Sequence, residues 1–144
     1  MNTQLEEGSM DSAAQPAHIA KGQLWTGRIL SGLAVLFMLF DTIIHALRGP
    51  QVVQGFAQLG FPLSIAIPLS TVEFIGIVLY VIPRTSVLGA ILLTGYLGGA
   101  VAAQVRIGAP LLGFVLAPVY VALFLWLGLY LRDERVRAVV PVRR

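Results

Sequence analysis

The sequence predicts an all-α fold: an antiparallel up-down four-helix transmembrane bundle, with a short interfacial helix between helices 1 and 2. Four long apolar stretches comprise residues 29–47, 61–82, 85–105 and 107–131. Each is close to the roughly 20 residues of helix that cross a bilayer. Charged residues make up only 12% of the chain, against about 25% in soluble domains. Only Pro83 and Arg84 separate the second and third stretches, and so short a turn permits only an antiparallel hairpin.

The composition excludes several classes of function. The chain of 144 residues contains no cysteine, which excludes disulfides, iron–sulfur clusters, thiolate metal sites and CxxC redox pairs. Its formal net charge of +3 is small, and the basic residues gather near the chain ends rather than in a nucleic-acid-binding patch. Any redox role must therefore use a bound cofactor or a partner subunit.

The two ends of the chain are expected to lie outside the bilayer. Residues 1–24 are polar and are predicted to form a disordered tail. They lack the basic start and apolar centre of a cleaved secretory signal, so the first span would act as its own insertion signal. The transmembrane domain is expected at 25–133, with spans at about 26–47, 63–82, 86–105 and 111–131. Residues 134–144 form a basic tail that would contact anionic lipid.

Apolar residues recur at helical spacing between the first two spans. They are Val52, Val53, Phe56, Ala57 and Leu59. Pro50 suits the first position of a helix, and Gly60 suits the residue after its end. A short amphipathic helix in the membrane interface is therefore predicted. Pro68 and Pro118 lie inside the second and fourth spans, where we expect them to kink the helices.

Basic residues indicate the orientation of the bundle. Four spans place both termini on the same side as the Arg84 turn. Eight of the ten basic residues would lie on that side: Lys21, Arg28, Arg84, Arg132, Arg135, Arg137, Arg143 and Arg144. Arg48 and Arg106 would lie on the other side. We therefore expect a multi-pass protein of the plasma or inner cell membrane with both termini in the cytoplasm.

Three titratable acid or imidazole side chains interrupt the spans: Asp41, His45 and Glu73. Asp41 lies about 20 Å along the first helix from Arg28, at about 1.5 Å per residue, and His45 follows one turn later on the same face. Glu73 lies near the midplane, where an ionised carboxylate facing lipid would cost about 2.5–3.5 kcal/mol. We expect Glu73 to face protein and either to pair with a cation or to remain protonated.

The third span is expected to supply the neighbours of these groups. Tyr96 would lie near the midplane, with Gln104 and Arg106 at the outer end. The up-down topology brings the outer ends of the first and third helices to one level, so Arg106 should reach toward Asp41 or His45. The candidate ligand-binding or polar-cluster residues are Asp41, His45, Glu73, Tyr96, Gln104 and Arg106.

These features also have simpler explanations than a ligand-binding site. Asp41 and His45 are too few for a metal site, which normally needs more ligands, and no third is apparent, so no metal is predicted. A polar network that only fixes helix register is an equal alternative. The small residues of the third span include a GxxxG that favours close helix packing within the bundle over homo-oligomerisation, although the latter stays open. These residues are Gly95, Gly98, Gly99, Ala102 and Ala103.

Several motifs are distributed over residues 25–133. They include Leu39-Phe-Asp41, Leu59-Gly-Phe-Pro62, Tyr80-Val-Ile-Pro-Arg84, the long run 85–100 followed by Val105-Arg106, and Pro118-Val-Tyr120. Together they resemble the DoxX-like family of small four-helix membrane proteins, and the long third-span motif is the most specific. The resemblance implies a four-helix membrane fold. Related DoxX proteins are named for a membrane subunit of a thiosulfate:quinone oxidoreductase, which implies a link to membrane redox chemistry.

The resemblance also bears on the candidate residues. Asp41, Glu73 and Arg106 match polar positions of the family pattern, whereas Gln104 stands where a histidine is expected. That departure argues against haem, metal or proton-relay chemistry at Gln104. No catalytic motif is present, so the chain is at most the membrane subunit of an oxidoreductase.

We therefore expect an accessory or ligand-binding subunit associated with membrane redox chemistry. A quinone is the candidate ligand and a redox subunit is the candidate partner. A small proton-coupled transporter or exporter, in which Asp41 and Glu73 relay charge, is one alternative. A purely structural assembly factor is another. Nucleic acid is not expected as a partner.

Overall fold

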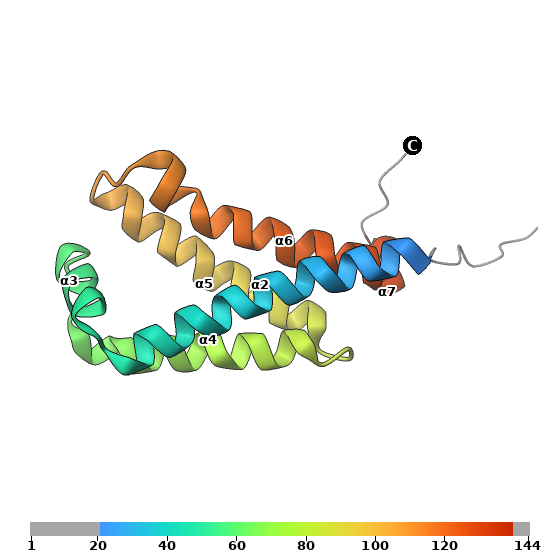
Figure 1. The fold of residues 1–144 in the computed structure, drawn as a ribbon, viewed down its shortest axis with the longest axis horizontal. Helices are drawn as coiled ribbons and strands as arrows, with labels where there is room; N and C mark the ends of the chain where they lie inside the picture. The colour runs from blue at the N-terminus through green and yellow to red at the C-terminus, as the bar shows by residue number, and fades with distance from the viewer. Residues whose placement is uncertain (1–20, 140–144) are drawn as a thin grey trace, which may run out of the picture.

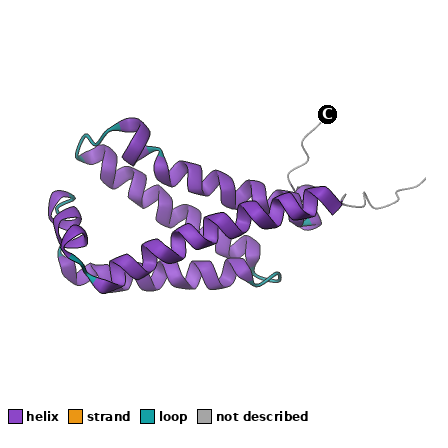
Figure 2. Ribbon diagram, in the orientation of Figure 1, coloured by secondary structure: helices purple, strands orange, loops and turns teal. Residues whose placement is uncertain are grey.

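The computed structural model describes residues 21–139. Its elements are α2 (Lys21–Leu47), α3 (Pro50–Gln58), the 3-10 turn η1 (Leu63–Ile65), α4 (Ala66–Val81), α5 (Ser86–Arg106), the π-helical turn η2 (Leu111–Val115), α6 (Ala117–Arg132) and α7 (Glu134–Val139) (Figure 2). The predicted all-α class is confirmed for this part of the chain. Most of the predicted N-terminal tail lies outside the described residues, and residues 21–24 begin α2. Residues 140–144 of the basic C-terminal tail also lie outside them.

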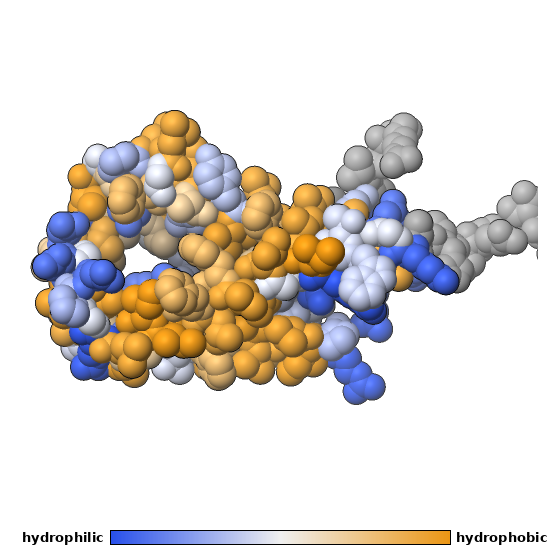
Figure 3. Space-filling view, viewed as in Figure 1, coloured by the Kyte–Doolittle hydropathy of each residue, from blue (hydrophilic) through white to orange (hydrophobic). Residues whose placement is uncertain are grey.

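Four helical segments are long and apolar enough to cross a membrane: Lys21–Leu47, Leu63–Val81, Ser86–Arg106 and Leu111–Arg132. Only 22–33% of the most apolar part of each segment is buried inside the protein. Figure 3 shows apolar surface over the middle of the molecule and hydrophilic residues gathered at its two ends. Because soluble monomers rarely expose apolar patches of this extent, the outer face is one that lipid solvates. The chain is a multi-pass membrane protein.

The four long helices form a ring of neighbouring pairs. Helix α2 packs on α6 and α4, and α5 packs on α4 and α6, so α2 and α5 occupy opposite corners. Figure 1 shows that successive long helices run in opposite directions. The start of α2, the α4–α5 turn and α7 lie at one end, which we call the closed end, and α3 lies at the other, which we call the open end.

Close backbone contacts join the helices toward the closed end. A Cβ added to Gly27 would lie 2.9 Å from the carbonyl oxygen of Gly128, and one added to Gly128 would lie 2.8 Å from the Ser31 nitrogen. A Cβ on Gly89 would lie only 2.2 Å from the backbone nitrogen of Tyr80. None of these positions has room for a methyl group. Small residues permit such approaches in membranes, where helices associate through packing and hydrogen bonds rather than the hydrophobic effect.

A buried tyrosine reinforces the closed end. The Tyr80 hydroxyl of α4 donates a hydrogen bond to the Leu125 carbonyl of α6 at 2.7 Å. It lies 2.9 Å from the Ser31 hydroxyl of α2, which therefore acts as the donor. The Arg132 guanidinium donates to the Tyr80 carbonyl at 3.2 Å and lies 4.8 Å above its ring. These contacts tie three of the four long helices together.

The small-residue patch of the third span does not behave as expected. Gly95, Gly98 and Gly99 each have open space where a Cβ would be, with no atom within 4 Å. The prediction that these glycines pack helices within the bundle is therefore wrong. The close approaches use other glycines, and no neighbouring helix comes close to α5 at these three positions.

The two prolines also lie differently from the prediction. Pro68 is the third residue of α4 and Pro118 the second residue of α6. Each belongs to the first turn of an α-helix, where the missing backbone N–H has no intrahelical partner to lose. The second span begins with the 3-10 turn η1 and the fourth with the π-helical turn η2, and each turn comes before the proline. The spans are therefore not continuous α-helices kinked at the proline.

Helix α3 forms where the sequence predicts a helix between the first two spans. Pro50 is its first residue, and Gly60 beyond its end adopts a φ of 68°, a left-handed conformation that favours glycine. Val52 and Phe56 are buried against Ala66 at the start of α4. The position of α3 in a membrane interface stays a prediction.

We expect Gly89→Ala to lower the free energy of unfolding by about 1–3 kcal/mol, because the new methyl group overlaps the Tyr80 backbone. The measurement is unfolding in detergent micelles, followed by circular dichroism. Gly98→Ala is the matched control on the same helix. It meets no atom and should be neutral or stabilising by up to about 1 kcal/mol. Equal effects of the two substitutions would contradict this account of the packing.

Candidate ligand-binding site

A cavity of about 690 Å³ lies between the helices at the open end. Its volume falls in the range of roughly 300–1,000 Å³ that is typical of small-molecule sites. Figure 3 shows the surface hollowed there, between the α2–α4 pair and the α5–α6 pair. Phe37 and Phe114 line the cavity and are 54% and 56% exposed. The hollow lies on the long, mostly apolar side of the molecule (Figure 3), so the cavity opens on the flank of the bundle.

The wall of the cavity is mainly apolar. Aromatic side chains come from α2, α3, the loop after α3, and η2: Phe37, Phe56, Phe61 and Phe114. Gly95, Gly99 and Ala103 recur every four residues along α5 and leave one side of the cavity wide. This wall was not predicted from the sequence. The four-residue spacing of small side chains was the available signal, but it was assigned to helix packing.

Polar groups line a small part of the cavity: Asp41, His45, Tyr96 and Gln104. Sequence reasoning placed all of them among the candidate residues. Asp41 and His45 lie one turn apart on α2, and Tyr96 and Gln104 lie on α5. The polar part of the wall is thus supplied by two helices at opposite corners of the ring.

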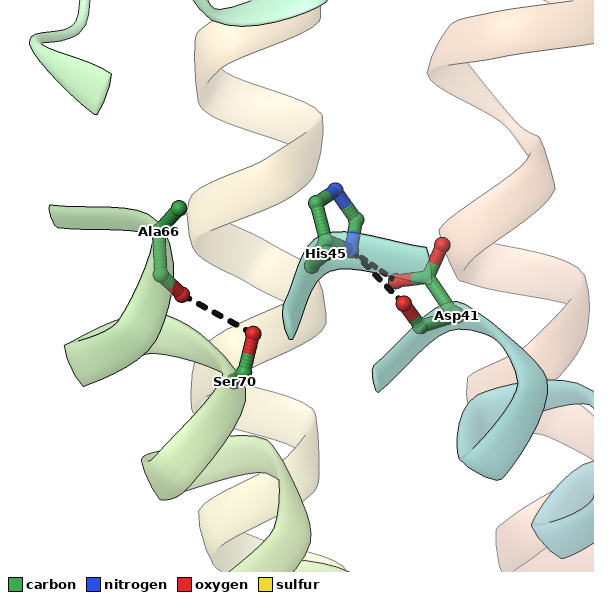
Figure 4. Close-up of polar contacts among 4 residues, drawn as sticks. All are labelled: Asp41, His45, Ala66 and Ser70. Carbon is green, nitrogen blue, oxygen red and sulfur yellow. Dashed lines mark hydrogen bonds and ion pairs between the residues drawn. The ribbon is translucent and has the colours of Figure 1, made fainter. Parts of the chain in front are cut away.

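Asp41 fixes the orientation of the His45 ring. His45 Nδ1 lies 3.0 Å from the Asp41 backbone oxygen and 3.1 Å from Asp41 Oδ2 (Figure 4). A carbonyl oxygen only accepts, so Nδ1 carries a proton and donates it, and in the neutral ring Nε2 has the free lone pair. Phe56 of α3 packs edge-on against the imidazole, with ring centroids 5.8 Å apart. The His45 and Asp41 side chains remain 27% and 39% exposed.

Glu73 lies deeper than this pair. Its side chain is 1% exposed, and neither carboxyl oxygen has a hydrogen-bond partner. The hydroxyls of Thr42 and Tyr96 lie nearby, but neither makes a well-formed hydrogen bond with it. Ser70, one turn earlier on α4, instead donates to the Ala66 carbonyl at 2.9 Å (Figure 4). Glu73 is therefore a buried polar group that the described protein leaves unsatisfied.

The structure brings Glu73 to the Asp41–His45 pair. One ligand atom from each of the three residues lies within 4.8 Å of the other two. The sequence analysis identified the pair but found no third neighbour, because spacing along the chain does not reveal how α4 is rotated against α2. Thr42, which is buried beside them, was missed for the same reason.

Arg106 does not join this group. Its guanidinium donates a hydrogen bond to the Leu59 carbonyl and lies 5.5 Å from the centre of the Phe61 ring. It therefore tethers the end of α5 to the loop after α3. Arg106 was expected to reach toward Asp41 or His45, but α5 stands opposite α2 in the ring and the side chain turns to the nearer loop.

The ring of apolar spans and the cavity at its open end define a multi-pass membrane protein with a polar group buried among its helices. The sequence model of the DoxX-like family matches residues 29–128. The match covers more than half of the chain, and the protein belongs to the DoxX-like family. No curated protein and no solved structure matches the chain.

We expect Glu73→Met to raise the free energy of unfolding by about 1–3 kcal/mol in protein purified with EDTA and without added ligand. A side chain of similar size then replaces a buried carboxyl group that lacks a partner. Denaturation in detergent micelles measures the change. Glu134→Met, at an exposed carboxylate of α7, should alter stability by no more than about 0.5 kcal/mol. A loss of stability in Glu73→Met would show that this carboxyl group has a partner.

Proposed function

We propose that this DoxX-like protein is a ligand-binding subunit of the cell membrane. It holds a small amphipathic molecule, such as a quinone, in the cavity at the open end. The observation that carries this proposal is a cavity of about 690 Å³ with an apolar wall and a few converging polar groups, the usual composition of a small-molecule site.

The polar groups in the wall suit a ligand that carries carbonyl oxygens. The Tyr96 hydroxyl and the Gln104 amide can both donate hydrogen bonds, and they lie on one helix. The aromatic side chains opposite offer faces and edges against which a flat ring can pack. A quinone head presents this combination of a flat apolar ring and two acceptors.

The route of entry also suits a membrane-dissolved ligand. The cavity opens on the apolar flank (Figure 3), and its lining includes the exposed side chains of Phe37 and Phe114, so a lipid-soluble molecule would enter sideways without crossing the charged ends. Membership of the DoxX-like family and the absence of any cysteine in the chain favour a role beside a redox partner subunit that carries the electron-transfer centre. Binding the quinone would be this chain's contribution.

We expect decylubiquinone to bind saturably to the purified protein in detergent, measured by quenching of tryptophan fluorescence. Gly99→Leu should weaken binding at least tenfold, which is about 1.4 kcal/mol, because the new side chain enters the cavity. Gly98→Leu is the matched control: Gly98 is the adjacent residue, has open space around it, and does not line the cavity. Absence of saturable binding, or equal weakening by the two variants, would count against the proposal.

We also propose that both termini face the cytoplasm, since basic residues predominate at the closed end. The chain has no cysteine, so single cysteines report orientation without background. In intact cells a membrane-impermeant maleimide should label Ile107→Cys, in the α5–η2 loop, and spare Pro83→Cys, in the α4–α5 turn. Both should be labelled after the membrane is opened. The reverse pattern would invert the proposed orientation.

A further inference from the structure

We propose that Asp41, His45 and Glu73 form a binding site for a divalent first-row transition-metal ion at the polar end of the cavity. The site joins α2 to α4. The proposal goes beyond ligand binding by the apolar part of the cavity, and it stands whether or not a quinone binds there.

The geometry is close to what an ion requires. One ligand atom from each residue lies within 4.8 Å of the other two. Nitrogen and oxygen ligands about 2.0–2.2 Å from a tetrahedral Zn²⁺ lie roughly 3.3 Å from one another. Side-chain rotations that bring the three ligand atoms closer together would be needed to close the triangle around an ion.

The buried carboxylate is a second, independent indication. Glu73 is 1% exposed, and both of its oxygens lack partners, whereas buried polar groups are normally satisfied. An ion between the three residues would supply that missing partner. Two carboxylates and a neutral imidazole carry a total charge of −2, so a divalent cation gives an uncharged complex in a part of the protein where a net charge is costly.

The His45 ring is held in the form that a metal needs. Its Nδ1–H donates to the Asp41 backbone oxygen at 3.0 Å, so in the neutral imidazole the lone pair that a metal would bind is on Nε2. Ligating histidines commonly donate their other N–H to a carbonyl or carboxylate, which orients the ring. The second oxygen of the Asp41 carboxylate is not engaged by His45 and is available to the ion.

The donor set indicates the class of metal. Imidazole suits zinc, iron, nickel and copper, and carboxylates suit manganese and magnesium, so a mixed set without sulfur favours Mn²⁺, Fe²⁺, Co²⁺ or Zn²⁺. Three protein ligands leave coordination positions open, as in catalytic rather than structural zinc sites. Asp41 and His45 line the cavity, so an open position would face it and could accept a water molecule or an oxygen of a bound ligand.

The test uses the full-length protein with a purification tag that contains no histidine, stripped with EDTA and then dialysed. Isothermal titration with Zn²⁺ should give saturable binding at one ion per chain, and Co²⁺ should give visible absorption bands of nitrogen and oxygen ligation. Glu73→Gln and His45→Asn should each weaken Zn²⁺ binding by more than about tenfold. His18→Asn and Glu134→Gln, which alter the other histidine and an exposed carboxylate, should leave it unchanged.

The proposal would be overturned if Zn²⁺ did not bind saturably to the unaltered protein or if Co²⁺ gave no absorption bands. It would also be overturned if the Zn²⁺ affinity of His45→Asn equalled that of His18→Asn. Circular dichroism checks that each variant is folded. If Glu73→Gln does not fold, the Co²⁺ spectrum of the unaltered protein and the Zn²⁺ affinities of the two histidine variants still test the proposal. Gly99→Leu should keep its Zn²⁺ affinity while losing quinone binding, so the two proposals fail independently.

Discussion

The close contact between helix backbones toward one end of the bundle is the constraint on which the rest of this structure depends. In lipid the helices gain little by hiding apolar side chains from their surroundings, so they need direct packing and hydrogen bonds to stay together. Gly27, Gly89 and Gly128 allow that packing, and Tyr80 links three helices beside them. Where these contacts stop, the helix pairs separate. The cavity at the open end follows from the closure at the other.

Glu73 is a polar side chain buried among the membrane-spanning helices, where an unpaired carboxyl group costs free energy. Helices α2 and α4 enclose its carboxyl group but provide no hydrogen-bond partner. A side chain of this kind does not stabilise the fold by itself. It lies beside Asp41 and His45, so in the proposed metal site this unpaired carboxyl group would lower the stability of the empty protein and bind the ion. The network that only fixes helix register, considered as an alternative, would be expected to satisfy its own buried oxygens.

Much of the fold could be predicted from the sequence because it depends on patterns along one helix. The spans, the helix after Pro50 and the Asp41–His45 pair follow from hydropathy and from the i, i+4 spacing. The errors about the site and the helix contacts concern relations between helices. The neighbour of Asp41 is Glu73 and not Arg106, and the contact glycines are Gly27, Gly89 and Gly128 rather than the GxxxG patch. The neighbour of Asp41 and the choice of contact glycines both depend on how each helix is rotated and which helices are adjacent. Hydropathy and residue spacing in a single sequence do not give this information.

Because the cavity opens on the apolar flank, the proposed ligand would reach it from the bilayer rather than from water. A molecule that enters from lipid equilibrates with the bilayer, so occupancy would follow its mole ratio to lipid rather than its amount in water. Every surrounding acyl chain is then a competitor at very high abundance. An apolar wall cannot discriminate against such chains, and the few polar groups at the inner end must supply the selectivity. A change in membrane composition would thus alter occupancy even at constant ligand supply.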